Sequence, residues 1–326
     1  MVRRVWQRIK KEEFIMIDFH CDVLSKMRKN DALTFQGGAD GTLDVTYERL
    51  RQSGTMLQTF AIYISPRQSA NIEPVLESVD LFYERILSCQ EMQLVTSAAD
   101  LESSITSGKT GALLSLEGVS GLQGRLSMLR LLYRLGVRAA GLTWNDGNWA
   151  ADGIMEPRGS GLTGKGREFV SACNELGIIV DVSHLSEQAF WDVAGLSTKP
   201  IIASHSNARA VCNHPRNLTD RQLQAIIQGE GRVGITFVPW FVTSDREACV
   251  ADLLGHVEHI CALGGEKHIM LGSDFDGIDS YMTDLKHPGE VYRLKEALLA
   301  RYSEVQVAGF MQNNALTFLR ENLPAV

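Results

Sequence analysis

The chain has 326 residues, of which 44% are hydrophobic and 22% are charged, as in an ordinary globular protein. Its net charge of -7 argues against nucleic acid or an anionic membrane as the main partner. The sequence contains no apolar run of the roughly 18 residues needed to span a bilayer, and its basic start lacks the apolar core of an export signal. We therefore expect a cytoplasmic protein whose six scattered cysteines are reduced.

Short apolar runs recur along the chain and are separated by segments with helical spacing. These runs are rich in β-branched residues and bounded by Gly or Pro, which is typical of parallel strands covered on both faces. The predicted strands cover residues 15–20, 56–63, 112–117, 138–143, 178–183, 201–204, 232–238 and 268–273. The predicted helices between and after them include residues 166–176, 187–193, 220–227, 251–263, 292–301, 303–312 and 314–323.

Eight strands that alternate with helices over this length predict an α/β fold, a closed (β/α)8 TIM-like barrel. A doubly wound open sheet is the alternative, but no G-x-G-x-x-G motif follows the first strand. The sequence shows no linker or repeat that would divide the chain. We expect one domain over residues 1–326, with residues 1–14 as an N-terminal extension.

Acidic and imidazole side chains follow the predicted strands. In a barrel the carboxyl ends of the strands converge on one face, which carries the active site. A buried acid costs free energy without a partner, and a pair of divalent ions about 3.5–4 Å apart would supply one. Taken singly, each residue could be a hydrogen-bonded rim residue or a cap, but together they favour a dinuclear metal centre. The candidate ligands are His20, Asp22, Glu117, His184 and His205, and Asp274 follows the last strand.

The relative orientation of the first two candidates follows from strand geometry. Side chains alternate along a strand, so His20 and Asp22 should point the same way from the end of the first strand. Four of the other five histidines lie on predicted loops or helices, where we expect them to be solvated. They are His214, His256, His259 and His287.

The strand-end motifs resemble those of the membrane (renal) dipeptidase family of zinc metallopeptidases, within the metal-dependent amidohydrolases. The matching segments are residues 17–22, 115–118, 181–184, 203–206, 216–218 and 272–277, in the family's order. The resemblance implies a bacterial-type member with two zinc ions per chain that hydrolyses dipeptides. It implies that His20 and Asp22 bind one zinc, that His184 and His205 bind the other, and that Glu117 bridges them.

The resemblance also implies a mechanism. A hydroxide held between the metals would attack the peptide bond, with Asp274 as proton shuttle, while Arg216 holds the C-terminal carboxylate of the substrate. Where the family often has an oxyanion-site histidine, this chain has Trp144, with Asn145 beside it. Either residue could donate in its place, or Trp144 could simply form a wall of the substrate pocket. L-D dipeptides are included as expected substrates, and a homodimer is suggested.

Two other functions stay open. The chain could be another dinuclear-metal amidohydrolase that acts on a different amide or on an N-acyl amino acid. Arg216 would then lose its role toward a dipeptide carboxylate. The chain could also be a barrel that binds metal or peptide without turnover, but such a protein would be expected to have lost a ligand or the shuttle, and all six residues are present.

Overall fold

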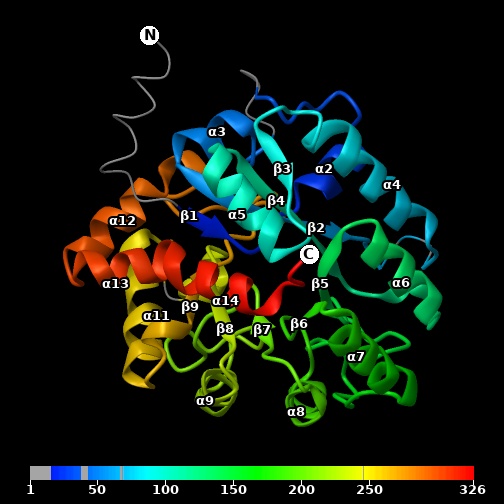
Figure 1. The fold of residues 1–326 in the computed structure, drawn as a ribbon. Helices are drawn as coiled ribbons and strands as arrows, with labels where there is room; N and C mark the ends of the chain where they lie inside the picture. The colour runs from blue at the N-terminus through cyan, green and yellow to red at the C-terminus, as the bar shows by residue number, and fades with distance from the viewer. Residues whose placement is uncertain (1–15, 38–42, 67, 69, 245) are drawn as a thin grey trace.

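The computed structural model describes residues 16–37, 43–66, 68, 70–244 and 246–326, and the predicted extension at 1–14 lies outside them. The strands of the described chain form one parallel sheet (Figure 1). They are β1 (Met16–Asp18), β2 (Thr55–Tyr63), β3 (Met92–Leu94), β4 (Thr110–Glu117), β5 (Val137–Gly141), β6 (Ile179–Asp181), β7 (Ile202–Ala203), β8 (Arg232–Ile235) and β9 (Ile269–Leu271).

The sheet closes into a barrel because β2 pairs with both β1 and β4. In the closing pair, Leu57 lies opposite Gly111 and Tyr63 lies opposite Glu117. The ring of β1, β2, β4, β5, β6, β7, β8 and β9 confirms the predicted (β/α)8 barrel. β3 lies outside the predicted set and pairs with the first residues of β4 beyond the ring. Several strands are shorter than predicted because the chain leaves the sheet early to reach the loops.

The helices alternate with the strands and surround them (Figure 1). Those in the first half are α2 (Val23–Lys29), α3 (Tyr47–Gln52), α4 (Glu73–Leu81), α5 (Ala98–Ser107), α6 (Leu126–Arg134) and α7 (Gly164–Leu176). Those in the second half are α8 (Glu187–Leu196), α9 (Asp220–Gln228), α10 (Pro239–Val242), α11 (Val250–Ala262), α12 (Tyr292–Leu299), α13 (Glu304–Ala308) and α14 (Asn314–Asn322). No described helix is long and apolar enough to cross a bilayer.

α14 closes one end of the barrel. In Figure 1 it lies in red across the front of the strands. Its buried Phe318 and Leu319 belong to the same apolar cluster as the barrel-interior residues Leu57, Leu113 and Met270. This helix therefore covers the amino-terminal end of the strands and leaves the other end to the loops.

Local backbone features place the turns at both ends of the strands. Ser97 caps the start of α5, and Gly108 ends that helix in a left-handed conformation with φ of 72°, which returns the chain into β4. Directly after β4, Gly118 has φ of 85°, and a Cβ there would lie 3.3 Å from the backbone nitrogen of Trp144. Glycine thus allows the β4 loop to turn closely against the β5 loop.

Candidate functional site

The six side chains that the sequence predicts to form a site meet at the carboxyl ends of the strands. Two follow β1, one ends β4, and one each follows β6, β7 and β9; all but the last are buried. β1 ends at Asp18, so the turn after the strand brings the first pair together, not the pleat of a strand as predicted. The six are His20, Asp22, Glu117, His184, His205 and Asp274.

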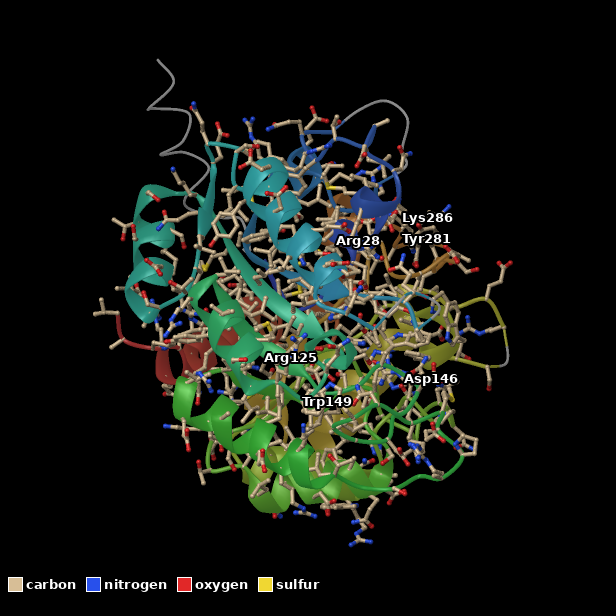
Figure 2. All side chains as sticks on the ribbon, turned by 90° about the vertical axis from the view of Figure 1, so that its right-hand side faces the viewer. Arg28, Arg125, Asp146, Trp149, Tyr281 and Lys286 are labelled. Atoms are coloured by element: carbon tan, nitrogen blue, oxygen red, sulfur yellow. The ribbon has the colours of Figure 1, made fainter. Side chains whose placement is uncertain are left out.

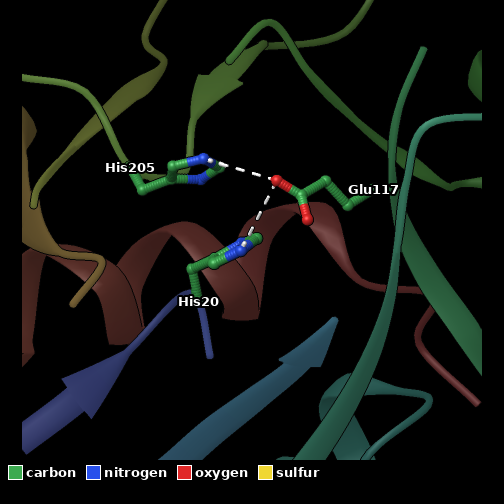
Figure 3. A group of neighbouring side chains, drawn as sticks. All are labelled: His20, Glu117 and His205. Atoms are coloured by element: carbon green, nitrogen blue, oxygen red, sulfur yellow. Dashed lines mark ion pairs between the residues drawn. The ribbon is translucent and has the colours of Figure 1, made fainter. Parts of the chain in front are cut away.

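One carboxylate oxygen lies at the centre of the group. Glu117 Oε1 is 2.8 Å from His184 Nε2, 3.7 Å from His205 Nε2 and 3.8 Å from His20 Nε2. Figure 3 shows this oxygen between the imidazoles of His20 and His205. The ligand atoms of His20, Glu117 and His205 all lie within 4.8 Å of one another, which is a distance at which they can share a metal ion.

His20 also belongs to a second group of possible ligands. Its Nε2 is 3.2 Å from Asp22 Oδ2 and 3.7 Å from Asp274 Oδ1. The other oxygen of Asp22, Oδ1, is buried and has no hydrogen-bond partner in the described part of the chain. A buried carboxylate oxygen without a donor is costly, and a cation beside it would remove that cost.

Hydrogen bonds behind the group orient two of the imidazoles. His184 Nδ1 lies 2.8 Å from the acceptor Asn145 Oδ1, so Nδ1 carries the proton. His205 Nδ1 lies 2.7 Å from Ser204 Oγ, and this hydroxyl donates in turn to Asp181. Both Nε2 atoms therefore present lone pairs, and they are 2.8 Å apart. Lone pairs at this distance repel unless a cation accepts them, so the donor set fits a metal ion.

The protonation of these two histidines agrees with that geometry. Burial lowers the pKa of His184, and the charges of Arg216 and His20 lower it further. Burial also lowers the pKa of His205, and the charges of His20 and Arg216 lower it further. Both imidazoles are therefore neutral at physiological pH, which is the form that binds metal.

The carboxylates of the site raise the pKa of the third imidazole, His20, in contrast to the other two. Burial lowers the pKa of His20, but the charges of Glu117, Asp22 and Asp274 outweigh it and raise the pKa to about 10. Burial raises the pKa of Glu117 well above its usual range, and the charge of Asp22 raises it further. Several carboxyl groups thus crowd into a small buried space, and divalent cations there would favour their charged forms.

Asp274 stands in a strained backbone position next to this group. Its φ is 66°, in the left-handed region, and His184 has φ of 69°. Such conformations are uncommon for residues other than glycine and cluster at functional sites. Burial raises the pKa of Asp274 to about 7, with a contribution from Asp22 that the charge of His20 partly offsets.

Arg216 reaches the site from the loop after β7. The side chain is buried, its Nη2 donates to the carbonyl oxygen of His205 at 3.3 Å, and its Nε has no partner within the described residues. The guanidinium also lies over the ring of Phe241, 5.4 Å from the ring centre. Burial lowers the pKa of Arg216 to about 10, so the side chain keeps its charge at neutral pH.

A cavity of about 310 Å³ opens beside Glu117. It is enclosed by the loops after β2, β4 and β5, and Trp144 forms part of its wall. The Trp144 ring centre lies 6.1 Å from that of His184 and 5.4 Å from that of Tyr63. The sequence predicts either an oxyanion donor or a pocket wall at Trp144, and the side chain lies in the wall of this cavity.

Asp18, which supports the site, was not among the sequence predictions. Asp18 is buried at the end of β1 and accepts hydrogen bonds from Ser273 N at 2.8 Å, Ser273 Oγ at 2.7 Å and Gln58 Nε2 at 3.0 Å. The two bonds from Ser273 fasten the end of β1 to the turn that carries Asp274, and the bond from Gln58 fastens it to β2. An acid inside an apolar run was the available signal, since such an acid needs buried donors.

One predicted feature is wrong. His256 was expected to be solvated, but it is fully buried on α11. Its Nδ1 accepts from Ala208 N at 3.2 Å, and its Nε2 donates to the carbonyl oxygen of Val242 at 3.0 Å. The imidazole has one acceptor and one donor, so it can satisfy two backbone groups at once in a place where water is excluded.

A family model supplies the first comparison with known proteins. The model described as Membrane dipeptidase (peptidase family M19) matches residues 4–323. The chain belongs to the membrane dipeptidase family. The resemblance seen in the strand-end motifs is thereby confirmed over nearly the whole chain.

Curated relatives of this family member carry dipeptidase names. Dipeptidase tcpJ of Claviceps purpurea is 35% identical over 258 residues, which cover 77% of this chain and 60% of the relative. Dipeptidase 3 of Homo sapiens is 31% identical over 322 residues, which cover 94% of this chain and 65% of the human protein. The chain thus spans less than two thirds of the length of either relative.

Solved structures of the same family share the fold. A metallo peptidase from Rhodobacter sphaeroides, liganded with a phosphinate mimic of the dipeptide L-Ala-D-Ala, has a TM-score of 0.88 and 28% identity. That match covers 96% of this chain and 100% of the other. The dipeptidase AC, a metallo peptidase, also has a TM-score of 0.88, at 29% identity, and covers 97% of this chain and 100% of its own.

Proposed function

We propose that this protein is a zinc-dependent dipeptidase that hydrolyses the peptide bond of dipeptides, L-D dipeptides included, with two Zn²⁺ per chain. The observation that carries the proposal is the pair of Nε2 atoms of His184 and His205, 2.8 Å apart and directed at a shared space beside Glu117. A family member that binds a dipeptide mimic supports the substrate class.

The ligand residues would divide between two metal positions. His20 and Asp22 would hold one ion, His184 and His205 the other, and Glu117 would contact both through its carboxylate. Three imidazoles and two carboxylates are a suitable donor set for zinc. When bound, two zinc ions would acidify a water molecule and polarise the scissile carbonyl.

Asp274 would carry the proton between the attacking water and the leaving amine. Burial raises the pKa of this carboxyl to about 7 in the metal-free protein, and a carboxyl at the site can accept and deliver a proton. Its Oδ1 lies 3.7 Å from His20 Nε2, so it stands at the edge of the ligand group. The left-handed backbone at Asp274 fixes that approach.

Arg216 would bind the C-terminal carboxylate of the dipeptide. Its guanidinium is buried, charged and only partly satisfied, with Nε lacking a partner among the described residues. A planar guanidinium matches a carboxylate through two parallel hydrogen bonds. This role requires a substrate with a free carboxylate.

Trp144 and Asn145 would act in different ways. Trp144 forms a wall of the cavity next to Glu117. Asn145 orients His184 through Oδ1, so the predicted donation to the oxyanion would have to come from its Nδ2. The cytoplasmic location and the homodimer stay predictions.

The experiment that tests the function is hydrolysis of a panel of L-L and L-D dipeptides by the zinc-loaded protein, the chelated protein and the chelated protein after zinc is restored. We expect cleavage that disappears on chelation and returns with about two zinc per chain. A folded, zinc-loaded protein that cleaves no dipeptide would contradict the proposal. Cleavage of L-L but of no L-D dipeptide would remove only the stereochemical part.

The Arg216→Ala variant separates the dipeptidase from another amidohydrolase. If Arg216 binds the substrate carboxylate, the variant should raise KM for a dipeptide strongly and leave KM for an amide without a carboxylate unchanged. The N-acetylated form of the same dipeptide tests the N-acyl amino acid alternative. Faster cleavage of the acetylated form would favour that alternative.

A further inference from the structure

The cavity beside Glu117 lies on the opposite side of the site from Arg216. Loops after β2, β4 and β5 line the cavity, whereas Arg216 follows β7, which stands across the barrel ring from β2. Under the proposed function, Arg216 holds the C-terminal carboxylate and the scissile bond lies over the ligand group. The N-terminal residue of the dipeptide then extends toward the cavity.

The walls of the cavity combine apolar surface with acidic charge. Ile64, Pro66 and Ala70 from the β2 loop give it an aliphatic side, and Trp144 and Trp149 give it aromatic faces. The indole nitrogen of Trp149 already donates to the carbonyl oxygen of Val119 at 2.7 Å, so this wall is fixed in place. Such a surface suits the methylene stem of a long side chain.

The charged residues in the described lining of the cavity are carboxylates. Its described lining residues include Asp146 and Glu117 and no lysine, arginine or histidine. Glu117 is directed at the imidazoles of the ligand group, with Oε1 2.8 Å from His184 Nε2. Asp146 is exposed at the cavity, and the structure gives it no hydrogen bond or ion pair with another described residue. Figure 2 labels Asp146 and, on the same loop, Trp149.

We infer that this cavity receives the side chain of the N-terminal residue and that Asp146 makes it favour a cationic side chain, lysine or arginine. The inference rests on the proposed dipeptidase function. The cavity of about 310 Å³ has room for a long side chain with its charged end. The aliphatic walls would cover the stem, and the carboxylate would pair with the ammonium or guanidinium group.

The test compares kcat/KM for L-Lys-L-Ala, L-Leu-L-Ala and L-Glu-L-Ala, together with L-Ala-L-Lys, in the zinc-loaded enzyme. We expect L-Lys-L-Ala to be the best of the first three, and Asp146→Asn to lower its kcat/KM about tenfold while L-Leu-L-Ala changes little. Asp146→Lys should reverse the preference toward L-Glu-L-Ala. Asp279→Asn is the matched control, since Asp279 is also an exposed carboxylate but lies on the loop after β9 and is not part of the cavity lining.

The outcomes separate this inference from the proposed function. If no dipeptide is cleaved, the proposed function fails. If dipeptides are cleaved but Asp146→Asn lowers kcat/KM for all of them equally, Asp146 binds the common α-ammonium and the side-chain inference is overturned. A fall confined to L-Ala-L-Lys would overturn it as well, because the cavity would then receive the C-terminal side chain.

Discussion

At the scale of single residues, Gly277 shows how tightly the chain approaches the carboxylates of the site. A Cβ at this position would lie 2.4 Å from Asp22 Oδ2 and 2.4 Å from Asp274 Oδ1. Gly277→Ala should therefore displace both carboxylates, and we expect kcat/KM to fall by about 100-fold, since displacements near 1 Å have such effects. Steady-state hydrolysis of a dipeptide by the zinc-loaded variant measures the fall.

A matched glycine variant controls for the added methyl group. A Cβ on Gly195, within α8, would meet nothing within 4 Å. Gly195→Ala should keep full activity and gain slightly in stability, because alanine favours a helix interior over glycine. Equal activity of the Gly277 and Gly195 variants would show that the two carboxylates need no exact placement.

Asn145 allows its two proposed roles to be separated. If it orients His184 through Oδ1, Asn145→Ala should weaken zinc binding by about 10- to 100-fold, which is the usual cost of losing a partner behind a ligand. Competition with a chromophoric chelator measures this affinity without any turnover. A lower kcat with unchanged zinc affinity would instead assign Asn145 to the oxyanion alone.

The sequence predicts the candidate ligands better than their supports, for a physical reason. His184 and His205 each end a short apolar run, and that pattern is visible in one dimension. The bond from Ser204 to Asp181 joins two different strand ends, so it depends on β6 and β7 being neighbours. Barrel closure sets such pairs, and spacing within one segment does not reveal them.

At the scale of elements, α14 contributes to stability from the end of the barrel opposite the site. Phe318 is fully buried among barrel-interior residues, and the Arg232 guanidinium carbon lies 5.3 Å from the centre of its ring. Phe318→Ala should lower the free energy of unfolding by about 3–5 kcal/mol, the usual cost of such a cavity. Urea unfolding measures the loss, and activity at low temperature should be kept. An unchanged urea midpoint would be incompatible with this role.

α11 carries the buried His256, which should make stability depend on pH. Burial lowers the pKa of this imidazole below its ordinary value of 6.5. The unfolded chain therefore binds a proton that the folded chain does not, so stability from this group is full at high pH and is lost as pH falls below the unfolded pKa. Between about pH 7 and pH 5 the loss can reach about 2 kcal/mol.

The His256→Gln variant tests that dependence. Glutamine offers an acceptor oxygen and a donor amide group, which can replace the two roles of His256 toward Ala208 and Val242, but it does not titrate. We expect the variant to lose less free energy of unfolding than the wild type between about pH 7 and pH 5. Urea unfolding at both pH values gives the comparison. Parallel losses in the two proteins would show that His256 does not contribute to the acid sensitivity.

Element prediction is strongest where the apolar pattern is strong. The barrel strands β2 and β4 have long apolar runs and lie close to their predicted bounds. β3 has only three residues, with just its first one buried, so it gives little apolar signal. Near the end of the chain, predicted helix 303–312 is divided into α13 and a π-helical turn at Gly309–Asn313, because hydrogen-bond register is not encoded in apolar spacing.

At the scale of the whole molecule, the barrel brings ionisable groups from strands far apart in sequence into one buried space. Burial raises the pKa of Glu117 there, the charges of Asp22 and Asp274 raise it further, and the charges of His20 and Arg216 offset only part of this. In the metal-free protein this crowding is unfavourable. In the zinc-loaded protein the same groups would become ligands, so one side chain should affect stability with opposite sign in the two states.

Glu117→Gln tests this reversal. Without metal, the variant lacks a buried carboxyl group among like charges, so its free energy of unfolding should equal or exceed that of the wild type. With zinc at about 1,000 times the Kd, the wild type gains about 4 kcal/mol, whereas the variant binds zinc more weakly and gains less. Thermal unfolding with chelator and with excess zinc should thus rank the two proteins in opposite orders. If the variant is less stable than the wild type by the same amount in both conditions, Glu117 supports the fold and does not bind the metals. The contribution of a metal ligand to stability would change when zinc is added.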